Sequence, residues 1–166
     1  MKLVDTIKPE KRKAFCLREK VLKREVEILN EEVQILLEKA QEKIPEELED
    51  LELLSTYESA VVRAAKLIRN SGYTFDKLRR FIRQNVLKEL RYKVYPLLDS
   101  LENLENETIS YIEQVKRCRD RTIVHLDPRF AFNLKRYQNN LASLEALKNV
   151  TDYLLKNIEL LFEREL

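Results

Sequence analysis

The residues best suited to chemistry gather around the only histidine of the chain, His125. It lies near the end of the run Cys118-Arg119-Asp120-Arg121-Thr122-Ile123-Val124-His125-Leu126-Asp127-Pro128. Histidine can accept and donate a proton near neutral pH without special tuning. Arg119 offers a planar fork of N–H groups that matches phosphate oxygens, and Asp120 can orient a neighbouring side chain. This combination favours acid–base chemistry at a phosphate.

Arg119 and His125 would not share a face of a regular helix. Six residues advance by about 600°, which leaves a net rotation of about 240°. The two side chains can converge if the helix frays or turns before Pro128, or if a second copy of the chain supplies one of them. The apolar residues beside the histidine also suit a second interpretation, in which its ring is a structural part of a helix end.

The glycine and cysteine content excludes several kinds of site. Gly72 is the only glycine, whereas P-loops and GxGxxG turns each need several. Cys16 and Cys118 are far apart and, with one histidine, cannot supply the four ligands of a zinc site. The carboxylates do not follow EF-hand spacing. We therefore expect no metal and no cofactor.

Charges interrupt every apolar stretch well before the roughly 18 residues that a membrane-spanning helix needs. The N-terminal residues also lack the apolar core of a signal peptide. We therefore expect a cytoplasmic protein with no membrane contact and with both cysteines reduced.

The pattern of apolar residues predicts an all-α fold, an antiparallel bundle of four or five helices in a single domain over residues 1–166. Pro96 predicts a break or kink, or the first residue of a new helix that leads into the Arg119 run. Thr74 is the expected cap of the third helix. The other expected helices cover residues 14–44, 47–70 and 143–163. Leu51 and Ile109 are among the residues expected to face the core.

The long first helix carries a narrow apolar seam with 4-3 spacing. Its members are Leu22, Val26, Leu29, Val33, Leu36 and Ala40. Such a seam suits packing inside a bundle, and it equally suits a coiled coil between two chains. The second interpretation would make the protein a helical adaptor that works through this seam.

The net charge of +2 hides three strongly charged segments. Residues 41–60 hold seven acids and one base, whereas residues 61–100 hold ten bases and three acids. Residues 116–136 hold seven bases and two acids. The two basic segments would suit a polyanion such as RNA. They would equally suit solvated helix faces with ion pairs four residues apart.

The run from Lys116 to Asp127 resembles the HEPN superfamily. The hallmark of that superfamily is an arginine, a polar residue, three to five further residues and a histidine late in a helical fold. Arg119, Asp120 and His125 fit this pattern, and the string looks most like the abortive-infection and toxin branch. The specific part of the resemblance covers about a dozen residues.

The resemblance implies a metal-independent endoribonuclease that acts as a homodimer, with the two motifs facing each other. The ribose 2′-OH would attack the adjacent phosphorus, with His125 as general acid and base. Arg119 would stabilise the phosphoryl charge, and Asp120 would position a neighbouring group. The remaining candidates are contacts to the RNA backbone, namely Lys116, Arg117, Arg121 and Arg129.

The resemblance also leaves an inactive relative as an alternative. Asp120 repels phosphate unless it is paired, and a pair with Arg119 or Arg121 would make the motif structural. The chain would then be a module that binds RNA or a nucleotide without cleaving it. Partners that the superfamily implies are an antitoxin or a nucleotidyltransferase.

Overall fold

The structure is a computed structural model that describes residues 1–39, 50–68, 74–124 and 139–166. Its α-helices are α1 (Pro9–Lys39), α2 (Leu51–Ile68), α3 (Phe75–Asn85), α4 (Arg91–Cys118) and α7 (Leu144–Ile158). The 3₁₀ turns are η1 (Leu3–Thr6) and η3 (Lys88–Leu90), and the π-helical turns are η4 (Arg119–Val124) and η5 (Glu159–Glu163). The described residues form no strand, so the predicted all-α bundle is confirmed.

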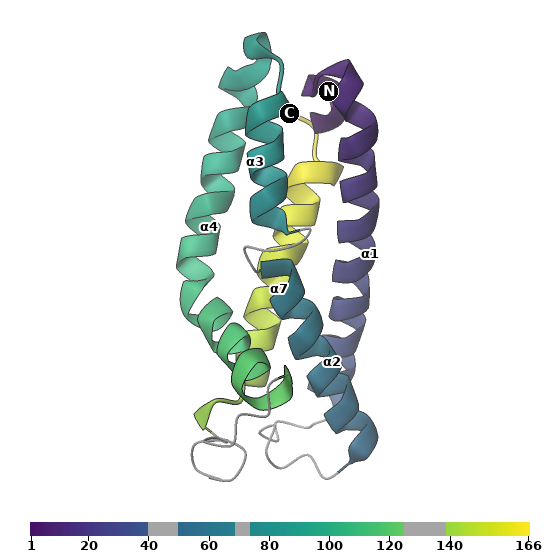
Figure 1. Ribbon diagram of the computed structural model, residues 1–166, viewed down its shortest axis with the longest axis vertical. Coiled ribbons are helices and arrows are strands. Elements are labelled where there is room, and N and C mark those ends of the chain that lie inside the picture. Colours follow the sequence, from purple (N-terminus) through teal and green to yellow (C-terminus); the bar gives the residue numbers. More distant parts are fainter. Residues whose placement is uncertain (40–49, 69–73, 125–138) are drawn as a thin grey trace.

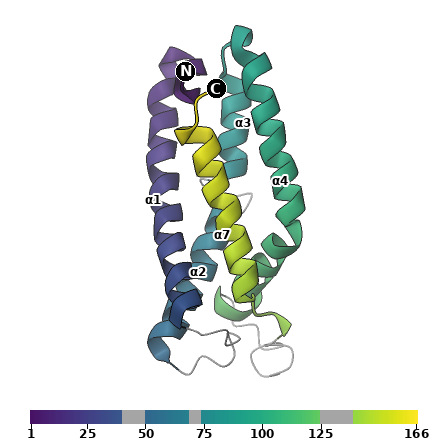
Figure 2. The same ribbon diagram turned by 180° about the vertical axis from the view of Figure 1, so that it is seen from behind.

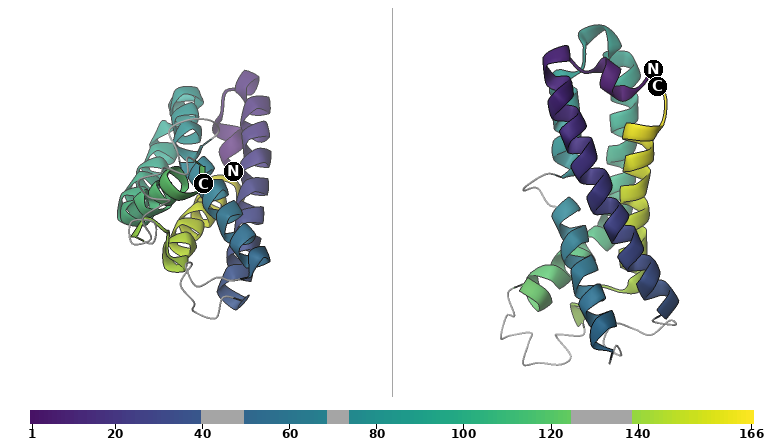
Figure 3. Two further views of the ribbon diagram at one scale, coloured as in Figure 1. Left: turned by 60° about the horizontal axis from the view of Figure 1, so that its bottom comes forward. Right: turned by 90° about the vertical axis from the view of Figure 1, so that its right-hand side faces the viewer.

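The helices form an elongated antiparallel bundle, and α1, α4 and α7 each run along most of its length (Figure 1). The shorter helices α2 and α3 follow each other along the remaining side (Figure 3). α2 packs against α1 and α4, and α7 packs against the same two helices. Seen from behind, α7 lies between α1 and α4 (Figure 2). The chain direction therefore alternates around the bundle, and α2 and α3 together occupy the place of a single long helix.

The 4-3 seam of α1 lies in the core. Its described members are each at most 2% exposed, and they are Leu22, Val26, Leu29, Val33 and Leu36. Ala40 lies outside the described residues. The interpretation of the seam as an internal packing face is confirmed. The coiled coil through the same seam is wrong, because helices of the same chain already cover it.

Capping residues set the starts of α3 and α7. The predicted cap at Thr74 is confirmed, whereas for the last helix the sequence predicted only the range 143–163. Thr74 Oγ1 accepts a hydrogen bond from the Lys77 N–H at 3.3 Å, and α3 begins at the next residue. Ser143 Oγ accepts from the Ala146 N–H at 3.0 Å at the start of α7. Each side chain satisfies an N–H group that has no partner inside its helix.

The first two helices begin elsewhere than the sequence predicts. α1 begins at Pro9 instead of near residue 14, because a proline at the first helical position has a suitable φ and no N–H to satisfy. The described part of α2 begins at Leu51, after Asp50, whose carboxylate accepts from the Glu52 N–H at 2.8 Å. The predicted ends at residues 44 and 70 lie outside the described residues.

Neither a break nor a helix start occurs at Pro96, so these two predictions are wrong, whereas the kink stays a prediction. α4 continues through Pro96, which lies in its second turn and forgoes one backbone hydrogen bond. The α-helical structure stops earlier, between the end of α3 at Asn85 and the start of α4 at Arg91. There Val86 forms an isolated β-bridge with Ile7.

Two apolar residues expected in the core face solvent. Leu51 is 81% exposed at the first residue of α2, and Ile109 on α4 is 45% exposed. The buried position next to Ile109 belongs to Thr108, whose hydroxyl donates to the Leu104 carbonyl at 2.8 Å. A polar residue that satisfies its hydroxyl within its own helix can therefore occupy a buried position that a simple apolar pattern would assign to its neighbour.

A buried cation joins α3, α4 and α7. Arg79 on α3 is 2% exposed, its Nη1 donates to Tyr153 Oη at 3.0 Å, and its Nη2 donates to the Glu105 carboxylate. Tyr153 Oη in turn donates to Glu105 Oε2 at 3.0 Å. Burial raises the pKa of Tyr153 to about 12, so its hydroxyl stays protonated and can donate to the carboxylate. An arginine counted in a basic segment of the sequence is thus part of the interior.

Replacing Arg79 with methionine should lower the free energy of unfolding by about 3–5 kcal/mol, because Glu105 would lose the cation that compensates its charge. Urea denaturation followed by circular dichroism measures the change. The matched control is Arg80→Met on the same helix, where the side chain is 68% exposed. We expect a change of no more than about 0.5 kcal/mol in this control. Equal effects of the two variants would contradict a structural role for the buried cation.

Candidate functional site

The described half of the sequence motif lies at the end of α4 that is farthest from the chain termini (Figure 1). The α-helix ends at Cys118, and residues Arg119–Val124 continue as the π-helical turn η4. π-Helical turns are rare and frequently occur at functional sites. His125 and Arg129 lie outside the described residues, so the Arg119–His125 geometry stays a prediction.

Arg119 and Asp120 form an ion pair. Arg119 Nη1 donates to Asp120 Oδ1 at 2.6 Å, and the two side chains are 18% and 39% exposed. Arg119 Nε is buried and has no hydrogen-bond partner among the described residues. One edge of the guanidinium is therefore held by a carboxylate, and the guanidinium retains a donor for a further acceptor.

The other described basic candidates differ in their partners and in their exposure to solvent. Lys116 Nζ forms an ion pair with Glu113 Oε1 at 3.1 Å. Arg121 Nη1 donates to Asn140 Oδ1 at 3.1 Å, which links η4 to the segment before α7. Arg117 is exposed. The structure thus brings Lys116, Arg117 and Arg121 to one end of the bundle, and Arg117 has the fewest internal constraints.

A buried polar cluster that the sequence did not indicate anchors this end of α4. Tyr57 on α2 donates to the Ala142 carbonyl at 2.7 Å and lies 3.4 Å from Cys118 Sγ. Thr122 Oγ1 donates to the Cys118 carbonyl at 2.5 Å. The cluster joins α2, the start of η4 and the segment before α7. The only signal for it in the sequence is a tyrosine on the apolar face of α2.

A surface pocket of about 370 Å³ lies between α2 and η4. Its lining includes Ser59, Arg63 and Lys66 from α2 and Ile123 from η4. This pocket adjoins the motif, and its hydroxyl and cationic groups suit an anionic ligand, whereas the carboxylate of Glu58 in the same lining opposes one. The 4-3 spacing of Ser59, Arg63 and Lys66, which places them on one side of α2, was the signal available in the sequence.

Carboxylates of α1 already neutralise the cations of this pocket. Arg63 Nη1 donates to Glu25 Oε2 at 2.7 Å, and its Nε donates to Glu32 Oε2 at 3.3 Å. Lys66 Nζ lies 3.5 Å from Glu25 Oε2, and Ser59 Oγ donates to Glu32 Oε1 at 2.5 Å. Much of the basic segment over residues 61–100 therefore binds the protein's own acids, which weakens its interpretation as an RNA-binding surface.

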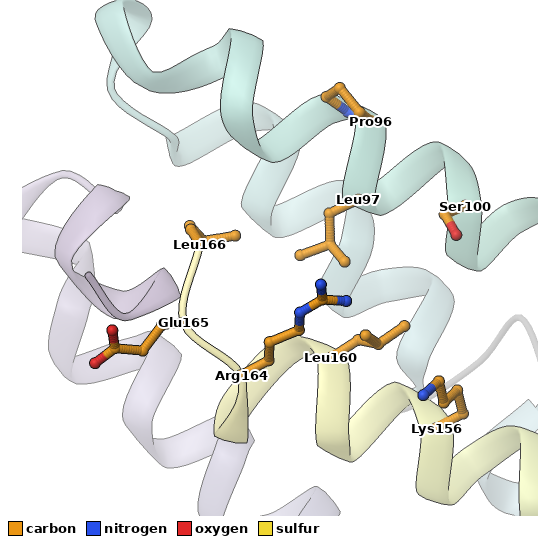
Figure 4. A pocket seen from close by; sticks show the side chains of 8 residues that line it. All are labelled: Pro96, Leu97, Ser100, Lys156, Leu160, Arg164, Glu165 and Leu166. Atoms are coloured by element: carbon orange, nitrogen blue, oxygen red, sulfur yellow. The ribbon is translucent and has the colours of Figure 1, made fainter.

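A pocket of about 490 Å³ lies at the other end of the bundle, between α4 and the C-terminal residues (Figure 4). Arg164 extends between Leu97 and Leu160, whereas Glu165 points away from them (Figure 4). Lys156 at its edge forms an ion pair with Glu159 at 2.7 Å. Because this pocket is remote from η4, it does not belong to the motif.

Metal-binding clusters and membrane-spanning helices are both absent from the described residues. Their His, Cys, Asp and Glu side chains do not assemble into groups of three or more that could hold a metal ion. None of the helices in the described segments combines the length and apolar character needed to cross a bilayer. Cys16 is exposed, Cys118 is buried, and both are free thiols.

Comparison with known proteins adds no relative. The chain matches no protein-family model, no curated protein and no solved structure. The resemblance to the HEPN superfamily therefore rests on the motif and stays a prediction.

Replacing Tyr57 with phenylalanine should lower the free energy of unfolding by about 1–2 kcal/mol, because the buried Ala142 carbonyl loses its hydroxyl donor. The matched control is Tyr92→Phe, at a side chain that is 71% exposed. Urea denaturation compares the two variants, and the control should stay within about 0.5 kcal/mol of the wild type. An unchanged stability of Tyr57→Phe would mean that the hydroxyl does not anchor the end of α4.

Proposed function

We propose that the chain is a metal-independent endoribonuclease of the toxin or abortive-infection type, acting on RNA in the cytoplasm as a homodimer. The observation that carries the proposal is the position of Arg119. It is half-buried at the start of the π-helical turn η4, whose Ile123 lines a pocket that also holds polar and cationic side chains. Its Nε is a buried donor that has no partner among the described residues, which is rare for a buried polar group and is frequent at functional sites.

In this proposal the 2′-OH of the ribose attacks the adjacent phosphorus. His125 takes the proton of the hydroxyl and, once protonated, gives a proton to the departing 5′ oxygen. The P–O5′ bond breaks, leaving a 2′,3′-cyclic phosphate and a 5′-OH. Arg119 stabilises the charge that builds on the phosphoryl oxygens, and Asp120 holds the guanidinium in place. Lys116, Arg117, Arg121 and Arg129 contact the RNA backbone.

His125→Ala should reduce cleavage of single-stranded RNA by about a hundredfold or more, the usual contribution of a general acid or base. Wild type and variant are compared in excess EDTA, and the product ends are tested for the cyclic phosphate. The control is Lys148→Ala on α7, which removes a cation that is 52% exposed and pairs only with Asp152. It should leave cleavage unchanged.

Two outcomes would overturn the catalytic proposal. Equal cutting by wild type and His125→Ala would place the activity outside the motif. Absence of cutting, together with equal RNA binding by both proteins, would favour a binding module instead.

The Arg119–Asp120 ion pair specifically favours that second function, in which the chain binds RNA or a nucleotide without cleaving it. A carboxylate 2.6 Å from the guanidinium competes with phosphate for the same N–H group. If the pair dominates, Arg119 serves the structure of η4 more than it serves chemistry.

Asp120→Asn should raise the affinity for single-stranded RNA by about three- to tenfold, because it removes a negative charge and weakens the competition for Arg119. Fluorescence anisotropy at low salt measures the affinity. Asp152→Asn on α7 is the matched control, since it makes the same charge change at an exposed carboxylate. A similar rise in both variants would show a general charge effect instead of a role for the ion pair.

A further inference from the structure

α1 carries a second apolar seam on its outer face. Leu17, Val21 and Ile35 are 57%, 37% and 39% exposed, and Ile28 is half-buried between them. With Arg24 and Glu31 they follow the spacing 4-3-4-3-4, which places all six side chains along one side of the helix. In the right-hand view of Figure 3, α1 lies in front of the other helices, and no other helix covers its outer side.

The exposed charges along α1 separate by sign between its two halves. The exposed charged residues of the first half carry a net charge of +3: Glu10, Lys11, Lys13, Lys20 and Arg24. Those of the second half carry a net charge of −2: Glu27, Glu31, Glu38 and Lys39. Within the described part of the chain, Arg24 and Glu31 take part in no ion pair. Arg24 and Glu31 of the outer seam are therefore uncompensated by any described residue of the same chain.

We propose that the outer seam of α1 pairs antiparallel with the same seam of a second copy of the chain. A two-fold axis near Ile28 brings the Ile28 residues of the two copies together. It also places Val21 opposite Ile35 of the second copy. Arg24 then faces Glu31 of the second copy, and by symmetry this ion pair forms twice. A parallel pairing would place Arg24 against Arg24 and Glu31 against Glu31, so charge excludes it.

The interface uses none of the groups proposed to act on RNA. η4 and the C-terminal end of α1 lie at the same end of the bundle (Figure 1). Antiparallel pairing therefore puts the two motifs at opposite ends of the assembly and leaves both accessible. A homodimer in which the two Arg119 motifs face each other would use a different interface. Loss of the α1 pairing would therefore leave that contact intact.

Charge reversal tests the pairing without disturbing the core, because Arg24 and Glu31 are exposed. Sedimentation equilibrium should show that Arg24→Glu and Glu31→Arg each weaken one association step by about tenfold or more, since two attractive contacts become repulsive. The two variants mixed in equal amounts should associate as tightly as the wild type. In that mixed pair both position-24 and position-31 contacts are again between opposite charges.

The mixture distinguishes the interface from any general effect of charge. Recovery on mixing supports the antiparallel pairing. Failure of the mixture to recover, or wild-type association that neither variant weakens, overturns it. RNA cleavage measured on the same samples should be unaffected, so the result does not depend on the proposed activity.

A cross-linking experiment fixes the orientation. In a Cys16→Ser background, Ile28→Cys should form an interchain disulfide under mild oxidation, because the two copies meet at this residue. In the wild type the Cys16 residues of an antiparallel pair are about 36 Å apart, at 1.5 Å per residue, and should stay unlinked. A disulfide through Cys16, or none through Ile28→Cys, would contradict the proposed register.

Discussion

A guanidinium buried in a helical core constrains the whole bundle, because its charge needs partners that water cannot supply. Arg79 obtains them from Glu105 on α4 and Tyr153 on α7. This requirement fixes the register of α3 against both helices. The other half of the same side of the bundle has its own polar anchor, the Tyr57 hydroxyl of α2. Two short helices can therefore take the place of one long helix, because each has its own polar contacts. Arg79 of α3 contacts α4 and α7, and Tyr57 of α2 contacts α4 and the segment before α7.

The position of the motif follows from these two anchors. α4 is held by the buried cation near its middle and by the Tyr57–Cys118 contact at its last residue. Arg119 begins the π-helical turn immediately afterwards, so its backbone position is fixed by the contacts of Cys118. The ion pair with Asp120 then decides between two uses of the same arginine. A carboxylate that orients Arg119 aids phosphate chemistry, whereas one that neutralises it leaves a structural turn.

Many charged side chains of this protein form contacts within the chain instead of remaining available to a partner. Arg63 and Lys66 contact acids of α1, and Arg79 lies in the core. A count of basic residues along the sequence therefore overstates the surface open to a polyanion. The outer side of α1 shows the opposite case. There the charges have no partners in the described chain, and their separation by sign suits a second copy.

The sequence by itself determined the helical class, the cap at Thr74 and the inner seam of α1, because these depend on local spacing and on a single backbone donor. The candidate motif was also visible as a spacing of residue types, although its histidine lies outside the described residues. Only the tertiary structure decided that α4 passes through Pro96 and that Arg79 is buried. Such outcomes depend on partners distant in sequence, and local pattern carries no information about which acid or hydroxyl will meet a given cation.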